Sequence, residues 1–259
     1  MKYQHLRHAT GVLSYGEIDI LIDPIFAPKE ANPPITNSWN ELRNPMVDFP
    51  FDLSSFKLPE HCLVTHLHSD HFDDYAKELL PKETRLLCQC ENEDHFKNIG
   101  FTNVTSIDKE LTLETINIQR VPGQHGTGIT AKLMGISSGY ILSAPNEPIL
   151  YITGDTIFYK DVKATLEKYK PDVILAFGGA AQFSHGDPIT LATEDILKLH
   201  EFAPQAKIIC VHMNTINHCR TTKEALKAFL SSKLGDSQYH DSFFIPDDGE
   251  TIDLSQLSL

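Results

Sequence analysis

The sequence predicts a layered α/β protein in which residues 1–259 form a single domain. Three observations lead to this fold class. The first part of the chain reads as strands joined by short turns, and the second part alternates strand-like with helix-like segments. No linker rich in glycine and serine separates the two parts. With 259 residues, 41% of them hydrophobic and 22% charged, the chain can bury a substantial core.

The first elements lie beside a long proline-rich stretch. Residues 10–15 and 18–22 read as two strands around a two-residue connection, which predicts a hairpin. Residues 24–59 hold seven of the fifteen prolines, so we expect a long ordered loop there, with one short helix at 38–43. This loop forms a lid or a substrate pocket, or its aromatic residues pack on the core or on a subunit interface. The sequence leaves both alternatives open, and with them a homo-oligomer.

From residue 60 onward, short apolar runs alternate with segments of helical periodicity. The expected strands are 62–65, 85–88, 149–153, 173–177 and 207–211, with several more between 104 and 143 that include 116–121 and 137–142. The expected helices are 72–80, 92–98, 160–169, 193–202 and 221–232.

The composition excludes several classes of protein. The chain carries 35 Asp+Glu, 22 Lys+Arg and 13 His, a formal net charge of −13 that argues against broad nucleic-acid binding. No apolar run approaches the roughly 20 residues of a membrane span, and the first residues do not read as a signal peptide. Five cysteines without a CxxC motif support neither a disulfide framework nor a zinc ribbon. We therefore expect a soluble, cytoplasmic protein.

The strongest chemical signal is the segment 63–71, which holds three histidines and a carboxylate within six residues. In an extended chain, residues i and i+2 point the same way, so His66 and His68 can converge on one metal ion. If the chain then turns into a helix, Asp70 and His71 face a second ion. Imidazole nitrogen and carboxylate oxygen are ligands that zinc favours at hydrolytic sites.

Further ligands are expected elsewhere, because this motif alone cannot complete two metal sites. Three residues directly follow apolar, strand-like runs or lie in the turn after one: His125, Asp155 and His212. Ligands at strand ends share one rim of a sheet, where sites commonly form. Taken singly, each is more often a structural residue, but together with the first motif they indicate a ligand set.

The order His66-x-His68-x-Asp70-His71, His125, Asp155, His212 resembles the metallo-β-lactamase-fold hydrolase superfamily. The resemblance implies a four-layer αβ/βα sandwich with a dinuclear metal site. One ion would take His66, His68 and His125, and the other Asp70, His71 and His212, with Asp155 bridging. We expect two divalent ions, zinc first, with manganese or iron as alternatives that the same ligands accept.

The N-terminal residues narrow the resemblance. Arg7-His8-Ala9-Thr10 and the run 20–26 are similar to the opening of the branch that contains ascorbate-6-phosphate lactonase and N-acylphosphatidylethanolamine phospholipase D. A carboxylate at Asp155 resembles the phosphodiesterase, glyoxalase II and lactonase branches. The resemblance therefore implies that a metal-bridging hydroxide hydrolyses a small, anionic phosphoester or lactone.

Several further side chains are candidates for catalysis or for contacts with the ligands. Asp70 would hold the second metal and could orient the hydroxide or relay its proton. His218 would reach the substrate as an acid or an oxyanion donor, or it is a structural residue before the next helix. Asp23 would fix a ring nitrogen of a ligating histidine, or it ends a strand before proline. The remaining candidates for contacts with the ligands or the substrate are His8 and His185.

Two other functions stay open. An iron-dependent oxidoreductase on the same scaffold is one, although the chain shows no redox module. A non-catalytic ligand-binding member of the fold is the other, although all seven ligand positions are filled.

Overall fold

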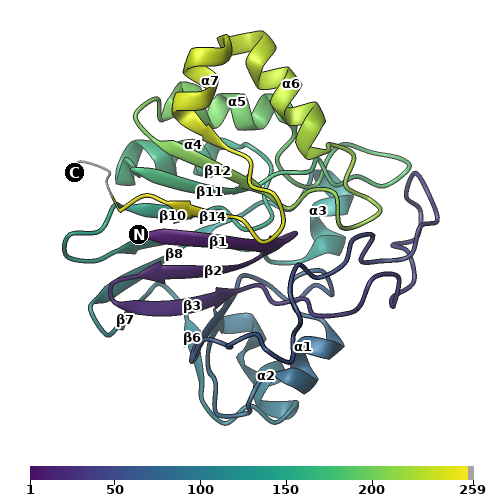
Figure 1. Cartoon of the computed structure of the whole chain (residues 1–259), viewed down its shortest axis with the longest axis vertical. Helices are drawn as coiled ribbons and strands as arrows, with labels where there is room; N and C mark the ends of the chain where they lie inside the picture. Colours follow the sequence, from purple (N-terminus) through teal and green to yellow (C-terminus); the bar gives the residue numbers. More distant parts are fainter. Residues whose placement is uncertain (256–259) are drawn as a thin grey trace.

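The strands form two seven-stranded sheets that pack face to face, as the computed structural model of residues 1–255 shows (Figure 1). The first sheet has the order β14-β1-β2-β3-β4-β5-β6. Its strands are β1 (Lys2–Arg7), β2 (Thr10–Tyr15), β3 (Ile18–Ile22), β4 (His61–Val64), β5 (Arg85–Gln89), β6 (Val104–Ile107) and β14 (Thr251–Asp253). The second sheet has the order β13-β12-β11-β10-β9-β8-β7. Its strands are β7 (Glu110–Leu113), β8 (Ile116–Pro122), β9 (Ser138–Ser143), β10 (Leu150–Ile152), β11 (Val173–Phe177), β12 (Lys207–Val211) and β13 (Phe243–Phe244).

Helices cover the outer face of each sheet. Three apolar clusters separate the layers: one between the sheets, one under α1 and α2, and one under α4, α5, α6 and α7. In Figure 1 the first two helices lie below the sheets and the other four lie above them. This arrangement confirms the four-layer αβ/βα sandwich. The helices are α1 (Asp74–Leu79), α2 (Glu93–Asn98), α3 (Gly128–Met134), α4 (Lys160–Tyr169), α5 (Thr193–Phe202), α6 (Lys223–Leu234) and α7 (Asp236–Ser242).

Strand direction explains why polar residues gather at one rim. In the first sheet, β1 and β3 each pair antiparallel with β2, and β3 pairs parallel with β4, so β1, β3 and β4 run the same way. In the second sheet, β8 and β10 each pair antiparallel with β9, and β10, β11 and β12 are parallel. The carboxyl ends of β1, β3 and β4 therefore share one edge of the first sheet, and those of β8, β10, β11 and β12 share one edge of the second.

The long loop 24–59 contains no helix, so the expected helix at 38–43 is wrong. Asn32 and Asn44 form an isolated antiparallel bridge instead. Asn40 explains the difference, since its side chain accepts from the backbone N–H of Leu42 at 3.0 Å and its backbone carbonyl accepts from Ser38 Oγ at 2.9 Å. Such local bonds offer the backbone an alternative to a helix.

A buried arginine attaches this loop to the first sheet. Arg7, at the end of β1, is fully buried. Its guanidinium donates to the carbonyl oxygens of Ile25 at 3.0 Å, Ala27 at 2.5 Å and Val47 at 3.2 Å. It also lies 5.3 Å from the ring centroid of Phe49. Burial lowers the pKa of Arg7 to about 10, so the side chain stays charged at neutral pH.

Most of the helices and strands expected after residue 60 are present, and the structure contains several further elements that were not expected. The segments α4, β11, α5 and β12 have the predicted bounds. β1, α3, α7, β13 and β14 were not predicted. β1 buries His5 and Arg7 beside Tyr3 and Leu6, so its inward residues do not form an apolar pattern. α3 buries none of its residues and therefore shows no apolar face that packs on the core.

The helices are short and the cysteines are free. The longest helix among residues 1–255, α6, has 12 residues. No helix in this range is long and apolar enough to cross a membrane. The five thiols are unpaired, so no disulfide contributes to stability.

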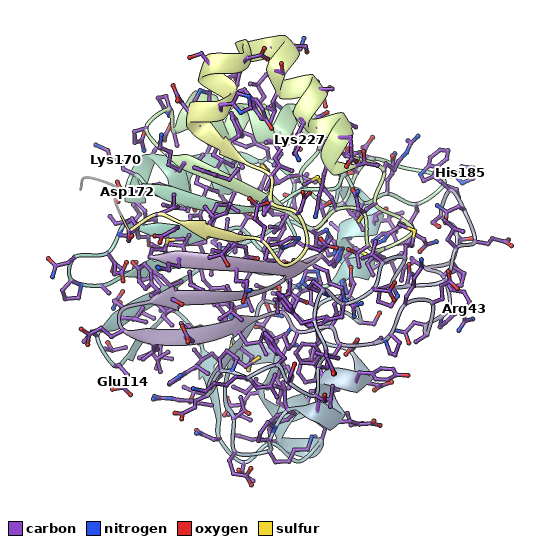
Figure 2. All side chains as sticks on the ribbon, in the orientation of Figure 1. Arg43, Glu114, Lys170, Asp172, His185 and Lys227 are labelled. Atoms are coloured by element: carbon purple, nitrogen blue, oxygen red, sulfur yellow. The ribbon has the colours of Figure 1, made fainter. Side chains whose placement is uncertain are left out.

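We expect Arg7→Met to lower the free energy of unfolding by about 2–3 kcal/mol, because buried carbonyl groups lose their donor. Chemical denaturation measures this change. Arg43→Met is the matched control, since Arg43 also donates to two loop carbonyls but lies at the surface (Figure 2). Its effect should stay within about 0.5 kcal/mol. Equal effects of the two substitutions would contradict the role of the buried arginine.

Candidate metal centre

The histidines and carboxylates of the candidate site all follow the carboxyl ends of strands. His8 follows β1 and Asp23 follows β3 in the first sheet. The other members lie after β4, β8, β10 and β12, and they are His66, His68, Asp70, His71, His125, Asp155 and His212. All of them are buried except His68, which is half-buried.

Asp23 fixes the turn that carries the first motif. Its Oδ1 accepts the backbone N–H of Thr65 at 2.7 Å, and its Oδ2 accepts the Thr65 hydroxyl at 2.7 Å. The same Oδ2 accepts from His71 Nδ1 at 2.8 Å. The Nε2 atom of His71 is therefore left to face the cluster, as in carboxylate–histidine–metal arrangements.

Three histidines form the first ligand group: His66, His68 and His125. One nitrogen from each lies within 4.8 Å of the others. His66 Nε2 and His68 Nδ1 are 3.0 Å apart. The second nitrogen of His125 donates to the carbonyl oxygen of Ile189 at 2.8 Å, which directs its Nε2 toward the cluster.

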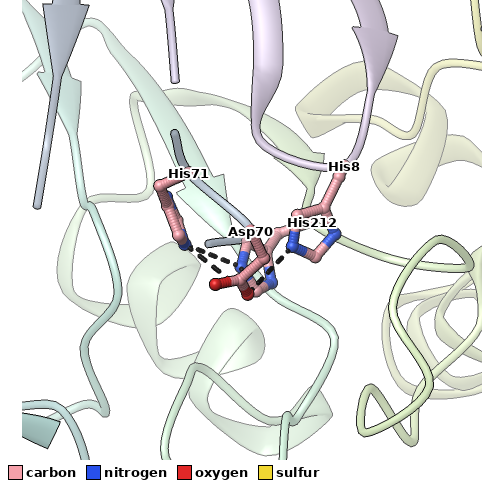
Figure 3. A group of neighbouring side chains, drawn as sticks. All are labelled: His8, Asp70, His71 and His212. Atoms are coloured by element: carbon pink, nitrogen blue, oxygen red, sulfur yellow. Dashed lines mark hydrogen bonds and ion pairs between the residues drawn. The ribbon is translucent and has the colours of Figure 1, made fainter. Parts of the chain in front are cut away.

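The second group combines three histidines and a carboxylate: His8, Asp70, His71 and His212 (Figure 3). His71 Nε2 and His212 Nε2 are 3.2 Å apart. Asp70 Oδ2 lies 3.4 Å from His8 Nε2, 3.8 Å from His212 Nε2 and 3.9 Å from His71 Nε2. The ring of His8 packs on that of His212 at 3.7 Å between centroids, and its backbone carbonyl accepts the N–H of His212 at 2.8 Å.

Asp155 lies between the two groups. Its Oδ2 is 3.4 Å from His125 Nε2 and 3.3 Å from His71 Nε2, and its Oδ1 is 3.3 Å from His212 Nε2. The preceding Gly154 has φ +59°, and a Cβ there would come within 2.3 Å of the Ser138 carbonyl oxygen. Only glycine fits this turn, which brings the carboxylate toward both groups.

Three members of the cluster adopt backbone conformations that side chains disfavour. His8, Asp23 and His212 have φ values of 53°, 42° and 70°. Such left-handed residues are uncommon outside glycine and asparagine, and they gather at functional sites.

The protonation states of most of the cluster suit cation binding. Burial raises the pKa of Asp155, but His212 and His71 outweigh it and hold this pKa well below the usual range. Burial lowers the pKa of His71, yet the carboxylates of Asp155 and Asp23 raise it well above its ordinary value. Burial holds the pKa of His66 and of His212 well below the ordinary value. Neutral imidazole and ionised carboxylate are the forms that bind metal. His66, His212 and Asp155 are therefore in the binding form, whereas His71 would release a proton when a cation binds.

The donor atoms of the cluster lie close enough together to hold divalent cations. Two pairs of imidazole nitrogens face each other at 3.0 and 3.2 Å, so each pair can share a proton or take part in holding a cation. Asp155 Oδ1 is buried and has no hydrogen-bond partner among the described residues. Cations held among these groups would give the facing nitrogens and Asp155 Oδ1 a partner, and the ligand types are those of zinc, manganese and iron sites.

A small pocket opens beside the cluster. It has a volume of about 190 Å³. Its walls combine cluster residues with the apolar side chains of Ile35, Met134, Phe183 and Ile189, and the lining includes His68, Ser69, Asp70, His125 and His218. None of the described lining residues is lysine or arginine.

The other candidates from the sequence have different locations. His218 lines the pocket, and its buried Nδ1 has no hydrogen-bond partner among the described residues. His185 is exposed at the periphery, beside Ser184 Oγ at 3.1 Å, so the structure does not bring it to the cluster (Figure 2).

The sequence did not predict two features of the site, the carbonyl of Ile189 that binds His125 and the apolar wall of the pocket. A backbone acceptor leaves no signature in the side-chain pattern.

The comparisons with known proteins agree with this geometry. A family model described as "Beta-lactamase superfamily domain" matches residues 19–213. The chain belongs to this superfamily. "UPF0173 protein YddR" of Bacillus subtilis (strain 168) is 34% identical over 255 residues, which are 97% of this chain and 99% of that protein. A relative from Methylobacterium nodulans, described as a UPF0173 metal-dependent hydrolase, is 26% identical over 81% of this chain and 84% of its own length.

Two solved structures of related proteins superpose closely on this chain. One is described as isothiocyanate hydrolase from Delia radicum gut bacteria, with a TM-score of 0.92, 32% identity and coverage of 98% of this chain and 99% of that one. The other, from Veillonella parvula, is described as a possible metal-dependent hydrolase, with a TM-score of 0.90, 35% identity and coverage of 97% and 98%. The chain is thus a member of the UPF0173 metal-dependent hydrolase family, and its His/Asp cluster is able to bind metal.

We expect Asp23→Asn to weaken metal binding roughly 10- to 100-fold, because the amide cannot accept from His71 and Thr65 as the carboxylate does. Competition with a chromophoric chelator measures the affinity. Asp19→Asn is the matched control, since Asp19 lies on β3, the strand that Asp23 follows, and is exposed and contacts Ser14. Unchanged affinity in Asp23→Asn would show that this carboxylate does not support a metal ligand.

Proposed function

We propose that this protein is a dinuclear metal-dependent hydrolase and that its substrate is a small neutral electrophile, an isothiocyanate. The observation that carries the substrate class is the pocket beside the cluster, which is small, partly apolar and free of lysine and arginine among its described lining residues. The relative described as isothiocyanate hydrolase supports the same class, since it is 32% identical over nearly all of the chain.

The pocket argues against the anionic phosphoester that the sequence resemblance implied. Proteins usually hold phosphoesters with arginine or lysine, which give charge-assisted hydrogen bonds. Here the non-reacting part of a substrate would instead contact Ile35, Met134 and Phe183. A neutral lactone is the second candidate, because it shares small size and lack of charge with an isothiocyanate.

The proposed reaction balances with one water. An oxygen–carbon bond forms at the central carbon of R–N=C=S, the carbon–nitrogen bond breaks, and both protons of water end on nitrogen. The products are an amine and carbonyl sulfide. When bound, two divalent cations lower the pKa of a water molecule and polarise the group under attack.

The chain's own residues bind the cations and move the protons. His66, His68 and His125 would hold one cation, Asp70, His71 and His212 the other, and Asp155 both.

The proton transfers fall to residues on the pocket wall. Asp70 would accept a proton from water, and His8 Nε2, which donates to Asp70 Oδ2 at 3.4 Å, would orient that carboxylate. His218 also lines the pocket, and we assign it the delivery of a proton to the leaving nitrogen.

A substrate panel tests the proposal. Protein loaded with zinc or manganese is expected to release carbonyl sulfide and amine from allyl isothiocyanate. Its kcat/KM for a phosphodiester should be lower by a factor of roughly 100 or more. Full chelation should abolish turnover, and added metal should restore it. Activity that survives complete metal removal would contradict the mechanism. Turnover of lactones or phosphodiesters without turnover of isothiocyanates would contradict the substrate class.

A further inference from the structure

One asparagine on the loop after β12 binds the 24–59 loop at several points. Asn217 is 2% exposed. Its Nδ2 donates to the carbonyl oxygen of Asn40 at 2.9 Å, and its backbone N–H donates to Asn44 Oδ1 at 2.9 Å. Asn44 returns a bond from its Nδ2 to Asn217 Oδ1 at 3.0 Å, and it is itself buried. The two asparagines are therefore linked in both directions across 173 residues of sequence.

The same side chain binds both polar backbone groups of Ile35, its N–H and its carbonyl oxygen. Asn217 Oδ1 accepts the N–H of Ile35 at 2.9 Å, and Asn217 Nδ2 donates to the carbonyl of Ile35 at 3.2 Å. This two-bond pairing resembles the bonding between neighbouring strands, although one partner is a side-chain amide. It fixes a loop residue that has no regular secondary structure around it.

Ile35 lines the pocket, and the residue after Asn217 is His218, which lines the same pocket. The segment 217–218 thus has two roles at the pocket. His218 contributes a polar side chain, and Asn217 holds the apolar wall residue Ile35 in place. The other apolar residues of the pocket come from α3 and from the 183–189 loop. That loop also attaches to the 24–59 loop, since Ser184 N–H donates to the Asn37 carbonyl at 2.5 Å.

We propose that Ile35 limits the size of the substrate side chain that the pocket admits, and that Asn217 is the positioning residue that holds Ile35 in place. The identity of the substrate rests on the proposed function, whereas the shape of the wall does not. Asn217 touches neither the metal ligands nor the substrate in this account, so its loss changes selectivity and leaves metal binding intact.

The test compares small and bulky ligands in metal-loaded protein. Turnover is measured with ethyl and benzyl isothiocyanate, and binding to the cobalt(II)-loaded protein is measured with ethanethiol and benzyl mercaptan through the cobalt–sulfur absorption band. Ile35→Ala should raise the benzyl-to-ethyl ratio roughly tenfold in either assay, since it removes methyl and methylene groups from the wall. Asn217→Ala should move the ratio in the same direction with unchanged metal content.

Two matched controls separate this effect from general destabilisation. Ile129→Ala changes an isoleucine that is 78% exposed on α3, and Asn98→Ala changes an exposed asparagine at the end of α2. Neither should change the ratio. If Asn217→Ala does not accumulate as folded protein, Asn217→Asp replaces it, because the carboxylate keeps the acceptor for Ile35 and loses the donor.

The outcomes distinguish the two proposals. An unchanged ratio in Ile35→Ala overturns the size role of Ile35. A lower thermal stability of the Asn217 variants with an unchanged ratio overturns the positioning role. A shifted thiol ratio without any isothiocyanate turnover contradicts the proposed substrate while supporting the wall.

Discussion

The buried carboxylate of Asp23 is the interaction on which the site most depends. It joins the end of β3 to the end of β4 through Thr65 and orients His71 at the same time. Burying a carboxylate away from water costs free energy unless its oxygens accept hydrogen bonds. Asp23 is fully buried, and every donor to its side chain comes from the motif that it positions. Burial raises the pKa of Asp23, and the contact with His71 opposes this rise. Without this carboxylate, both the turn and the direction of the His71 ring would lose their support.

Strand direction extends this local constraint to the whole centre. Because β1, β3 and β4 run the same way, as do β8, β10 and β12, one rim of each sheet collects the residues that follow these strands. The cluster then gathers ionisable groups that could not be buried singly. Their donor atoms compensate one another only in part, which is why unsatisfied atoms such as Asp155 Oδ1 persist.

The sequence predicted the parts of this arrangement that follow local rules. The spacing of His66, His68, Asp70 and His71 reflects the alternation of an extended chain, and apolar strands before Asp155 and His212 are visible in the sequence. β1 escaped prediction because it buries His5 and Arg7 rather than an apolar series. The wall of the pocket was not predicted for another reason. Ile35 and Asn217 are 182 residues apart, and a local sequence pattern does not indicate a contact between residues so distant in the chain. His185 lies close in sequence to pocket residues, yet its side chain points to solvent.

The net charge of −13 describes the average surface and not the site. The resemblance to lactonase and phosphodiesterase branches led to an anionic substrate, whereas the pocket offers apolar walls from three separate segments. In the proposed function, the substrate class depends on loops whose positions are held by long-range hydrogen bonds. The candidate metal ligands, by contrast, follow directly on strands of the two sheets or lie in the turns after them.

Anomalous X-ray diffraction at the zinc edge, on crystals of zinc-loaded protein, would show whether the His/Asp cluster binds two metal ions. A dinuclear centre predicts two peaks roughly 3.5–4 Å apart. One should lie among His66, His68 and His125, the other among Asp70, His71 and His212, with the Asp155 carboxylate between them. A single peak, or peaks away from these residues, would contradict it.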